Sequence, residues 1–338
     1  MARSRVTIRD VAASAGVSHQ TVSRVINQSE HVRPATRERV EQAIAELGYR
    51  PNAIARHMAR GRTSTLACIA PNLTDHTFVS IIDGAETDAR HHDYFLLSAS
   101  ARDEKTFICM MEDLVDSRRV EGIMVFNPYA DRRYMHLPLD FPTVFAGARP
   151  REGEINSISL DDEIVGYEAT RHLLDLQHRD IAMITGPMSE DTTQDRCQGY
   201  ERALREAGIE PEPHWVIEGD WSARSGYDAL MQLATEDGLR TAIFAQNDPM
   251  AAGAFRAMKD LGLEVPHNLS VIGVDDIPLS AFLDPPLTTF RQDFQLIGRE
   301  AASLLIQRIN QPDAHSRQLR LAAELIVRRS TAVFKPNS

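Results

Sequence analysis

The sequence of 338 residues has no long apolar run and contains only three cysteines. No stretch reaches the roughly 18 consecutive apolar residues of a membrane-spanning helix, so we expect no membrane segment. The N-terminus is polar and basic and shows no apolar core of a secretory signal. Cys68, Cys109 and Cys197 are scattered and lack metal-ligand spacing, which favours reduced thiols in a cytoplasmic protein.

Signatures of common enzymes are missing as well. The sequence contains no phosphate-binding GxxxxGKS or GxxxxGKT loop, no GxGxxG after a predicted strand, no HExxH and no GxSxG. Asp275 and Asp276 form a carboxylate pair, but adjacent residues of an extended strand point to opposite sides. His91, His92 and Asp93 are typical of a solvated helix end. We therefore expect no catalysis, no cofactor and no metal site.

Charge is distributed unevenly along a chain whose total is −11. Residues 1–62 contain eleven arginines and five acidic residues, a net charge of +6, which leaves −17 for the remainder. A cationic head suits contact with phosphates, whereas an anionic body stays soluble and avoids them. The distribution therefore predicts that the N-terminal segment meets a nucleic acid.

Residues Thr7 to Asn27 carry the pattern of two helices joined by a tight turn, TIRDVAASAGVSHQTVSRVIN. Thr7 and Asp10 stand at capping-box spacing at the start of the first helix. Gly16-Val17 suits the turn, and Ser18 can cap the second helix.

The second of these helices has two chemically different faces. Val22, Val25 and Ile26 recur at helical spacing and predict the buried side. The opposite side carries polar side chains, namely His19, Gln20, Ser23, Arg24 and Asn27. A helix that buries one face and presents donors, acceptors and a cation on the other is typical of a helix-turn-helix recognition helix.

A third helix and a linker follow. Pro34 suits a first helical position, Val40–Leu47 carries an apolar stripe, and Gly48 suits a helix end. Asn52 can cap a short segment, Ala53–Arg60, which is too short to be a stable helix alone. Composition leaves two interpretations of that segment open, a flexible linker or a helix that forms only when docked.

From Leu66 onward, short apolar runs alternate with longer amphipathic stretches. The runs predicted as strands are Leu66–Ala70, Phe95–Ser98, Gly122–Phe126, Thr143–Phe145, Ile181–Thr185, Trp215–Glu218, Ala242–Ala245 and Val271–Val274. The stretches predicted as helices include Phe78–His92, Lys105–Asp116, Gly166–Leu176, Cys197–Gly208, Ala223–Ala234, Met250–Gly262 and Leu296–Asn310. The alternation predicts an α/β architecture with doubly wound parallel sheets. Its length of roughly 275 residues exceeds one ordinary domain, so we expect two lobes with a ligand cleft at the carboxyl ends of the strands.

With these motifs in view, the whole chain resembles the LacI/GalR family of transcriptional regulators. The motifs that carry the resemblance are VTIRDVAASAGVSHQTVSRVIN, TRERVEQAIAELGYRPNAIAR, LLDLQHRDIAMITGP, AIFAQNDPMAAGAFRAMKDLG, LSVIGVDDIPLSAFLDPPLTTFRQD and LIVRRST. The resemblance implies a small all-α helix-turn-helix head, a hinge helix and a two-lobed core like that of periplasmic sugar-binding proteins. It also implies a repressor that binds a pseudo-palindromic operator in double-stranded DNA as a homodimer and is switched by a small-molecule effector.

The resemblance divides the chain into a DNA-binding head over residues 1–50, a hinge over 51–62 and an effector-binding and dimerisation core over 63–338. Within the core, the first lobe would comprise residues 63–161 and 291–320, and the second 162–290 and 321–331. The chain has no C-terminal leucine heptads of the kind that make some relatives tetramers, so we expect a dimer.

Carried onto matching positions, the family's base-contacting residues are His19, Gln20 and Arg24. Their chemistry agrees, because Gln can pair with adenine and Arg with guanine in the major groove. Further DNA contacts, mainly those that fix the register on the backbone, would come from Thr7, Ser18, Thr21, Ser23, Asn27, His31, Tyr49 and Asn52.

In the hinge, Met58 matches an apolar residue, usually leucine, that family members wedge into the minor groove at the operator centre. Methionine is apolar and flexible and therefore suits a wedge. Ala55 matches a small position that lets the two hinge helices of a dimer approach. The resemblance thus favours a helix that folds on DNA over a permanent coil for Ala53–Arg60.

The resemblance also implies an effector cleft between the lobes. The expected effector contacts are Asn72, His76, Phe78, Asn127, Arg149, Asp161, Arg196, Trp221, Asn247 and Asp275. A guanidinium and a carboxylate can grip neighbouring hydroxyls, and an aromatic ring can cover the C–H face of a sugar. We therefore expect a sugar or sugar derivative.

The sequence leaves several alternatives open. Many family members carry an aspartate near the end of the Thr143–Phe145 strand, where this chain has Arg149 and no acid, which would suit a sugar phosphate or sugar acid. A purine corepressor uses the same scaffold. A periplasmic solute-binding protein is disfavoured by the basic head and the missing signal peptide, and an enzyme on this core is disfavoured by the missing catalytic motifs. Whether the effector releases or promotes DNA binding is not specified.

Overall fold

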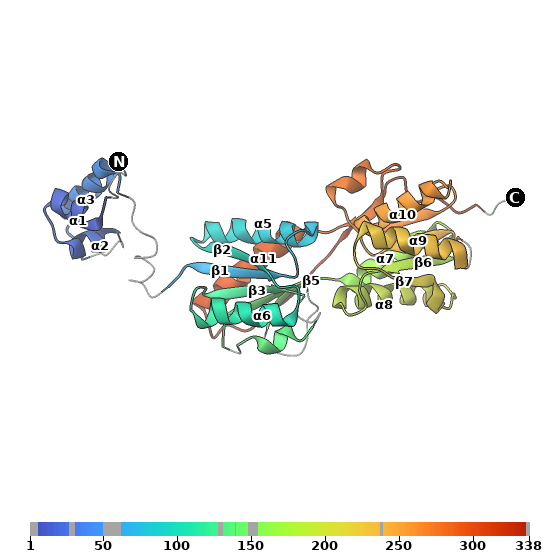
Figure 1. The fold of residues 1–338 in the computed structure, drawn as a ribbon, viewed down its shortest axis with the longest axis horizontal. Coiled ribbons are helices and arrows are strands. Elements are labelled where there is room, and N and C mark those ends of the chain that lie inside the picture. Colours follow the sequence, from blue (N-terminus) through green and yellow to red (C-terminus); the bar gives the residue numbers. More distant parts are fainter. Residues whose placement is uncertain are drawn as a thin grey trace. The chain divides into compact units, whose positions relative to one another are not determined.

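The computed structural model describes residues 6–26, 31–49, 62–127, 131–138, 140–147, 155–236 and 239–335. The chain divides into two compact units, Met1–Ser64 and Thr65–Ser338 (Figure 1). Asn27, the hinge residues Asn52, Ala55 and Met58, and Arg149 lie outside the described residues, as does the predicted hinge helix. No helix of the described residues is long and apolar enough to cross a membrane.

The first unit contains three described helices, α1 (Ile8–Ala15), α2 (His19–Ile26) and α3 (Pro34–Leu47). Thr7 and Asp10 form the predicted capping box, in which each side chain accepts from the other residue's backbone N–H. Gly16 ends α1 in the left-handed conformation, with φ of 63°, which glycine adopts without a Cβ penalty. Ser18 accepts from the Thr21 N–H at 3.2 Å and so caps α2 as predicted.

The core of this unit is small and apolar. Its buried members come from all three helices and are Val11, Ala12, Ala15, Val22, Val25, Val40 and Ala43. Pro34 occupies the first turn of α3, where a missing N–H costs no hydrogen bond. Gly48 ends α3 with φ of 60°. The apolar faces predicted for the three helices therefore pack against one another.

The described residues of the second unit form two six-stranded sheets, each at the centre of one lobe. The first sheet has the order β11-β5-β4-β3-β1-β2. Its strands are β1 (Thr65–Ala70), β2 (Phe95–Ser100), β3 (Gly122–Phe126), β4 (Thr143–Ala146), β5 (Asn156–Leu160) and β11 (Gln318–Leu321). Its helices are α5 (His76–His91), α6 (Glu104–Met111), the π-helical turn η1 (Glu112–Asp116), the 3-10 turn η2 (Arg133–His136) and α11 (Phe294–Asn310).

The second sheet has the order β12-β10-β9-β8-β6-β7. Its strands are β6 (Ile181–Thr185), β7 (Val216–Glu218), β8 (Ala242–Ala245), β9 (Ser270–Asp275), β10 (Thr288–Arg291) and β12 (Glu324–Ile326). Its helices are α7 (Asp162–Asp175), α8 (Asp191–Glu206), α9 (Ala223–Glu236) and α10 (Asp248–Asp260), with 3-10 turns η3 (Pro213–Trp215) and η4 (Pro278–Phe282).

Both sheets are covered on both faces, which explains why their central strands are apolar throughout. In β1, Leu66 and Cys68 pack with α5 and α11, whereas Ala67 and Ile69 pack with α6 on the other face. The second lobe repeats the pattern, with α7 and α8 on one face and α9 and α10 on the other. The predicted doubly wound α/β fold is thereby confirmed.

The chain crosses between the lobes three times, after β5, after β10 and after β11. Strands β1 to β5 and β11 run parallel within their sheet, but β12 runs antiparallel to β10. Strand β12 is antiparallel because of where the chain enters the second sheet. Strand β11 ends at the edge of its sheet that faces the second lobe, so β12 begins at the carboxyl edge of the second sheet and runs in the opposite direction to β10. The parallel pattern predicted from the sequence is therefore wrong for β12.

Candidate effector cavity and DNA-contacting surface

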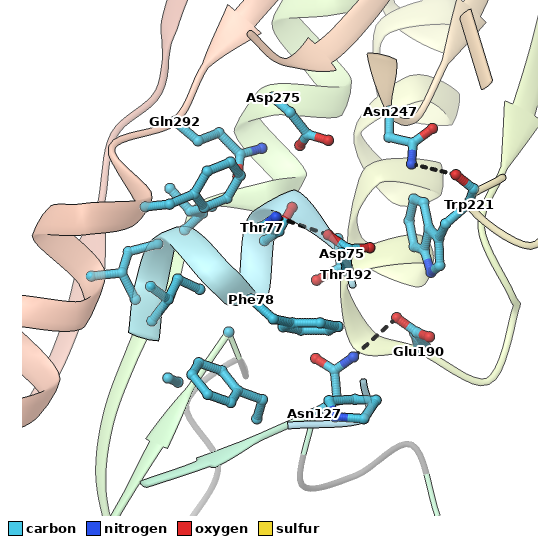
Figure 2. Close-up of a pocket in the computed structure, with 18 of the residues that line it drawn as sticks. Asp75, Thr77, Phe78, Asn127, Glu190, Thr192, Trp221, Asn247, Asp275 and Gln292 are labelled. Carbon is cyan, nitrogen blue, oxygen red and sulfur yellow. Dashed lines mark hydrogen bonds between the residues drawn. The ribbon is translucent and has the colours of Figure 1, made fainter. Parts of the chain in front are cut away.

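A cavity of about 200 Å³ lies between the lobes, where the carboxyl ends of both sets of strands meet (Figure 2). Open parallel sheets bind ligands at this edge, because loops and helix N-termini converge there. The described residues that line it are Pro71, Asn72, Asp75, Thr77, Phe78, Ile81, Phe126, Asn127, Ala146, Gly147, Leu160, Asp162, Glu190, Thr192, Arg196, Asp220, Trp221, Asn247, Asp275, Gln292, Phe294 and Ile297.

Among the described residues that line the cavity, Arg196 is the one arginine or lysine. Its guanidinium is held in place by protein partners. Its Nε lies 2.9 Å from Asp162 Oδ1 and a terminal nitrogen lies 2.8 Å from the same oxygen. A second terminal nitrogen donates to the Gln246 carbonyl. Both ionic side chains are buried, so their pairing offsets a large desolvation cost. The pair holds the guanidinium at one orientation toward the cavity.

Trp221 provides an aromatic wall beside that guanidinium. The Arg196 Cζ lies 6.0 Å from the ring centroid, within cation–π range. Trp221 has a φ of 70°, an uncommon backbone conformation for a non-glycine residue. Its ring packs on Gly186, where a Cβ would lie 2.0 Å from Trp221 Cζ2. The glycine at position 186 is therefore required for the ring to lie where it does.

Asn247 is held by two hydrogen bonds. Its Oδ1 caps α10 by accepting from the Met250 N–H at 2.9 Å, and its Nδ2 donates to the Trp221 carbonyl at 2.9 Å. The dashed line in Figure 2 marks the second of these bonds. Asn247 thus positions the tryptophan as well as lining the cavity.

Asp275 and Asp276 have different surroundings, but not because they are neighbours in an extended strand. Their φ angles are 119° and 54°, so the extended backbone expected from the sequence is wrong at this pair. Asp276 pairs with Arg291 at 2.8 Å and with Arg328 at 2.6 Å, away from the cavity lining. Asp275 lines the cavity and accepts no hydrogen bond from any residue that the structure describes. Burial raises the pKa of the Asp275 carboxyl well above its ordinary value, and the Arg196 charge opposes that shift.

A hydrogen bond crosses the cavity from one lobe to the other. Asn127, which follows β3 in the first lobe, donates from Nδ2 to Glu190 Oε2 at 3.3 Å. Glu190 precedes α8 in the second lobe. Figure 2 shows the two side chains directed toward each other at one side of the cavity. Burial raises the pKa of Glu190, with a smaller opposing effect from its hydrogen bond to the Trp221 side chain.

The first lobe contributes mostly apolar surface. Phe78 and Phe126 lie with ring centroids 5.6 Å apart and planes tilted by 51°. Ile81, Phe294 and Ile297 continue this wall from α5 and α11. An apolar wall opposite fixed polar groups suits a small organic ligand with one hydrophobic face and several hydroxyl or amide groups.

The cavity brings together seven of the ten predicted effector residues: Asn72, Phe78, Asn127, Arg196, Trp221, Asn247 and Asp275. His76 and Asp161 are not in the lining. His76 is exposed on the first turn of α5, with its Nε2 3.4 Å from Ser80 Oγ. Asp161 caps α7 and lies 3.9 Å from Arg320. Arg149 lies outside the described residues.

Sequence reasoning missed several lining residues, among them Asp162, Glu190, Thr192 and Gln292. Three of these lie at or next to the N-termini of α7 and α8, directly after strands or interlobe crossings. Their position at helix N-termini could have identified them from the sequence. In parallel sheets, the helix N-termini lie at the carboxyl edge of the strands, where ligands bind. Among the described residues, no cluster of His, Cys, Asp and Glu is arranged to hold a metal.

In the first unit, the predicted base-contacting residues His19, Gln20 and Arg24 are exposed on α2, opposite the buried Val22 and Val25. The remaining described residues of the predicted DNA contacts have mixed exposure. Thr7, Ser18 and His31 are exposed, and Thr21, Ser23 and Tyr49 are half-buried. The hydroxyls of Thr7 and Ser18 also serve as helix caps.

Comparison with known proteins agrees with this architecture. Residues 7–52 match the model of bacterial regulatory proteins of the lacI family, and residues 170–331 match a periplasmic binding protein-like domain. The chain is 34% identical over 329 residues to the HTH-type transcriptional repressor PurR of Haemophilus influenzae (strain PittEE), covering 96% of this chain and 98% of that protein.

Two solved structures extend the comparison. A Lac repressor dimer bound to operator and the anti-inducer ONPF has a TM-score of 0.88 and 33% identity, covering 97% of this chain and 100% of the other. The transcriptional regulator CelR, solved in complex with cellobiose, has a TM-score of 0.75 and 32% identity, covering 96% of this chain and 100% of the other. The relatives named here are regulators rather than enzymes. The chain therefore belongs to the lacI family of bacterial regulatory proteins and is a DNA-binding transcriptional regulator.

Proposed function

We propose that this regulator is a repressor that binds a pseudo-palindromic operator as a homodimer and that a sugar or sugar derivative in the interlobe cavity switches its affinity for DNA. The observation that carries the proposal is the cavity itself. It combines a fixed guanidinium on Arg196, a carboxyl on Asp275 that accepts no hydrogen bond from the described residues, and an aromatic wall at Trp221.

The DNA-contacting part of the proposal rests on the exposed face of α2. His19, Gln20 and Arg24 lie on that face, and their side chains can pair with base edges in the major groove. Residues 1–62 carry a net charge of +6, which suits the phosphate backbone. Thr21 and Ser23 would fix the register through backbone contacts.

The remaining predicted DNA contacts, Thr7, Ser18, Asn27, His31, Tyr49 and Asn52, belong to the proposal as register-fixing contacts. In the hinge, Met58 would wedge into the minor groove and Ala55 would let two hinges approach. A Lac repressor dimer has been solved on its operator, and the same arrangement of two heads on two half-sites is proposed for this chain.

The effector part rests on the chemistry of the two cavity walls. Arg196 and Asp275 can bind adjacent hydroxyls as donor and acceptor, and Asn127 and Asn247 add amide groups. Phe78 and Trp221 can cover the C–H faces of a sugar ring from either side. CelR, a regulator of similar structure, was solved with cellobiose, which agrees with a carbohydrate effector.

Switching would follow from closure of the lobes around the ligand. The chain crosses between the lobes at three places, so a ligand that contacts both walls stabilises one angle between them. A sugar that favours the DNA-releasing state acts as an inducer, and one that favours the DNA-binding state acts as a corepressor. DNA-bound protein would reside in the cytoplasm on the nucleoid.

The DNA-contacting residues can be tested by binding-site selection followed by fluorescence anisotropy on the selected duplex. Arg24→Ala should weaken specific binding by about 1–3 kcal/mol and relax the preference at one base pair of each half-site. Arg39→Ala, which removes the same charge from the exposed surface of α3, is the matched control. Equal losses and unchanged sequence preference in both variants would contradict the assignment of α2.

The effector can be tested on the same duplex. A panel of neutral sugars (ribose, glucose, galactose and cellobiose) is titrated into the protein–operator complex, and anisotropy reports release or tightening. The proposal expects one or more of these sugars to change operator affinity by about 5–150-fold. If none does, and a purine base does, the sugar assignment fails and the corepressor alternative takes its place.

A further inference from the structure

Asp248 is a buried carboxylate behind the cavity wall. It is the first residue of α10, is only 1% exposed and is not among the residues that line the cavity. Burying a charge costs free energy unless hydrogen-bond donors surround it. Three donors do so here: the Ile277 N–H lies 3.1 Å from Oδ2, the Ser280 hydroxyl donates to the same oxygen, and the Thr289 hydroxyl donates to Oδ1. The carboxylate therefore joins the start of α10 to the turn after β9, to η4 and to β10.

The turn after β9 has an unusual backbone. Asp275 and Asp276 have consecutive φ angles of 119° and 54°, in the region that favours glycine. Such conformations cost free energy and persist only where surrounding contacts hold them. The side chain of Asp276 pairs with two arginines, whereas Asp248 accepts from the backbone N–H of Ile277. Asp248 thus holds the backbone of the turn itself.

Strand β9 makes room for this carboxylate. Gly273 lies two residues before Asp275, and a Cβ on it would lie 2.3 Å from Asp248 Oδ1. A side chain at position 273 would therefore displace the carboxylate. Asp248 packs directly against the strand whose last residue is Asp275, and it binds the turn that follows.

The start of α10 also holds a second cavity wall. Asn247, the residue before Asp248, donates to the Trp221 carbonyl at 2.9 Å. Asp275 and Trp221 both line the cavity (Figure 2). Two consecutive residues therefore contact the segments that carry an aromatic group and an acidic group of the same lobe.

We propose that Asp248 is a positioning residue of the effector site: it accepts from the Ile277 N–H and so holds the backbone of Asp275 at the angle that directs its carboxyl toward the ligand. The inference deepens the sugar-effector proposal and rests on it. Asp248 acts through Asp275 and makes no contact with the ligand. Loss of its acceptor oxygens should therefore weaken ligand binding even where the lobe stays folded.

Asp248→Leu removes every acceptor at this position and keeps a side chain of similar volume. The Ile277 N–H then has no acceptor there, and the turn is no longer held. Calorimetry on the full-length protein with ribose, glucose, galactose and cellobiose measures the result. The sugar that binds the wild type should bind the variant at least about tenfold more weakly. Wild-type affinity in the folded variant overturns the proposal.

Asp248→Asn should restore binding. Its side-chain oxygen can accept from the Ile277 N–H and the Ser280 hydroxyl, while the Thr289 hydroxyl reverses to accept from the amide. The affinity should therefore stay within about threefold of the wild type. An affinity as low as that of Asp248→Leu would show that the charge, and not the hold on the turn, supports binding, and would overturn the proposal.

Hydrogen–deuterium exchange tests the turn directly. In the unliganded protein, the Ile277 amide should exchange at least about tenfold faster in Asp248→Leu than in the wild type or Asp248→Asn. Equal exchange in all three overturns the proposal. If Asp248→Leu does not fold, Gly273→Ala replaces it, because the added Cβ displaces the carboxylate while every polar group remains. Sugar affinity in Gly273→Ala should also fall, and an unchanged affinity overturns the proposal.

Ser270→Ala is the matched control. Ser270 is buried at the other end of β9, where it bonds His178 and the Ala332 N–H. Its loss should lower Tm and leave sugar affinity unchanged. If Ser270→Ala weakened binding as much as Asp248→Leu, general stability of the lobe would explain both, and the inference would fail alone. Failure of all four sugars to bind the wild type rejects the sugar-effector proposal and this inference together.

Discussion

The first lobe contributes most of the rings and aliphatic side chains of the cavity, whereas the second contributes most of its charged and polar groups. Yet the two lobes have the same strand order: β2-β1-β3-β4-β5-β11 in one and β7-β6-β8-β9-β10-β12 in the other. The same winding therefore presents two different chemistries at the same edge. Function at this site is a property of side chains and their partners, and the fold only determines where they meet.

The lobes also differ in how firmly their cavity groups are held. In the second lobe, Arg196 is fixed by Asp162, and Asn247 by the first turn of α10. In the first lobe, Asn72 and Asp75 are held by hydrogen bonds at the start of α5, whereas the aromatic wall at Phe78 is half-buried and packs on Phe126. We infer that the second lobe is the preorganised half of the site and that the first closes on a ligand already held there. The predictions below can break or sharpen this comparison.

The largest effect is expected from Arg196→Met. It leaves Asp162 buried without its cation, which should cost about 3–5 kcal/mol of unfolding free energy and abolish sugar binding. Arg202→Met is a matched control, because Arg202 pairs with Glu163 between the same two helices but is about 40% exposed. The control should lose no more than about 1 kcal/mol in urea unfolding. Similar losses in both variants would show that burial does not distinguish the pairs.

The adjacent aspartates should separate stability from ligand binding. Asp276→Asn weakens the pairs with Arg291 and Arg328 and should cost about 2–3 kcal/mol in urea unfolding. Sugar affinity in that variant should stay unchanged. Asp275→Asn should lose sugar binding with no loss of stability, since it keeps the side-chain volume and changes a carboxyl that has no hydrogen-bond partner among the described residues. If Asp276→Asn lost sugar binding and Asp275→Asn lost stability instead, Asp276 rather than Asp275 would be the ligand contact.

The sequence predicts local features of both units well. The capping box of Thr7 and Asp10 and the end of α3 at Gly48 depend on residues close together in the chain, and both are confirmed. The buried strands β3 and β6 also have the predicted bounds, because each is a short apolar run. Where neighbours in sequence decide the structure, the pattern is sufficient.

Features that depend on tertiary contacts were missed. Strand β5 has the sequence NSISL, whose serines gave no apolar run although both are buried. The three-residue strand β12 is defined by its pairing with β10. Asp161 and Asp162 look alike in sequence, but Asp161 caps α7 and Asp162 pairs with Arg196. Only the packing of α7 against α8 decides which acid reaches the cavity.

The pH dependence of stability should differ between the lobes. In the second lobe, burial raises the pKa of Asp248 from 3.8 to about 6 and raises those of Glu190 and Asp275. A carboxyl with a raised pKa stabilises the fold below its unfolded pKa, and that contribution is lost as pH rises through the folded pKa. The unliganded protein should therefore lose about 1–2 kcal/mol between about pH 5 and 7.5 from Asp248 alone.

Urea unfolding across this pH range checks the expectation, with Asp248→Asn flattening the slope. The control comes from the first lobe, where hydrogen bonding to Arg133 lowers the pKa of Asp131. The contribution of Asp131 is present above its unfolded pKa and lost as pH falls, so Asp131→Asn should leave the decline toward pH 7.5 intact. A stability that rises over the same range would reject the pKa shifts of the second lobe.

The smallest effect is expected from Phe78→Leu in the first lobe. The leucine keeps an apolar wall but loses ring packing on Phe126 and on the sugar face, worth about 0.5–1.5 kcal/mol. Sugar affinity should fall roughly twofold to tenfold. The measurement is a sugar titration that monitors the fluorescence of Trp221 in a Trp215→Phe background. The urea midpoint should hardly change, because Phe78 is half-buried and anchors no ion pair. If Phe78→Leu instead abolished binding as completely as Arg196→Met, the first lobe would be as essential to capture as the second. The order of events inferred from the fixed groups would then be wrong.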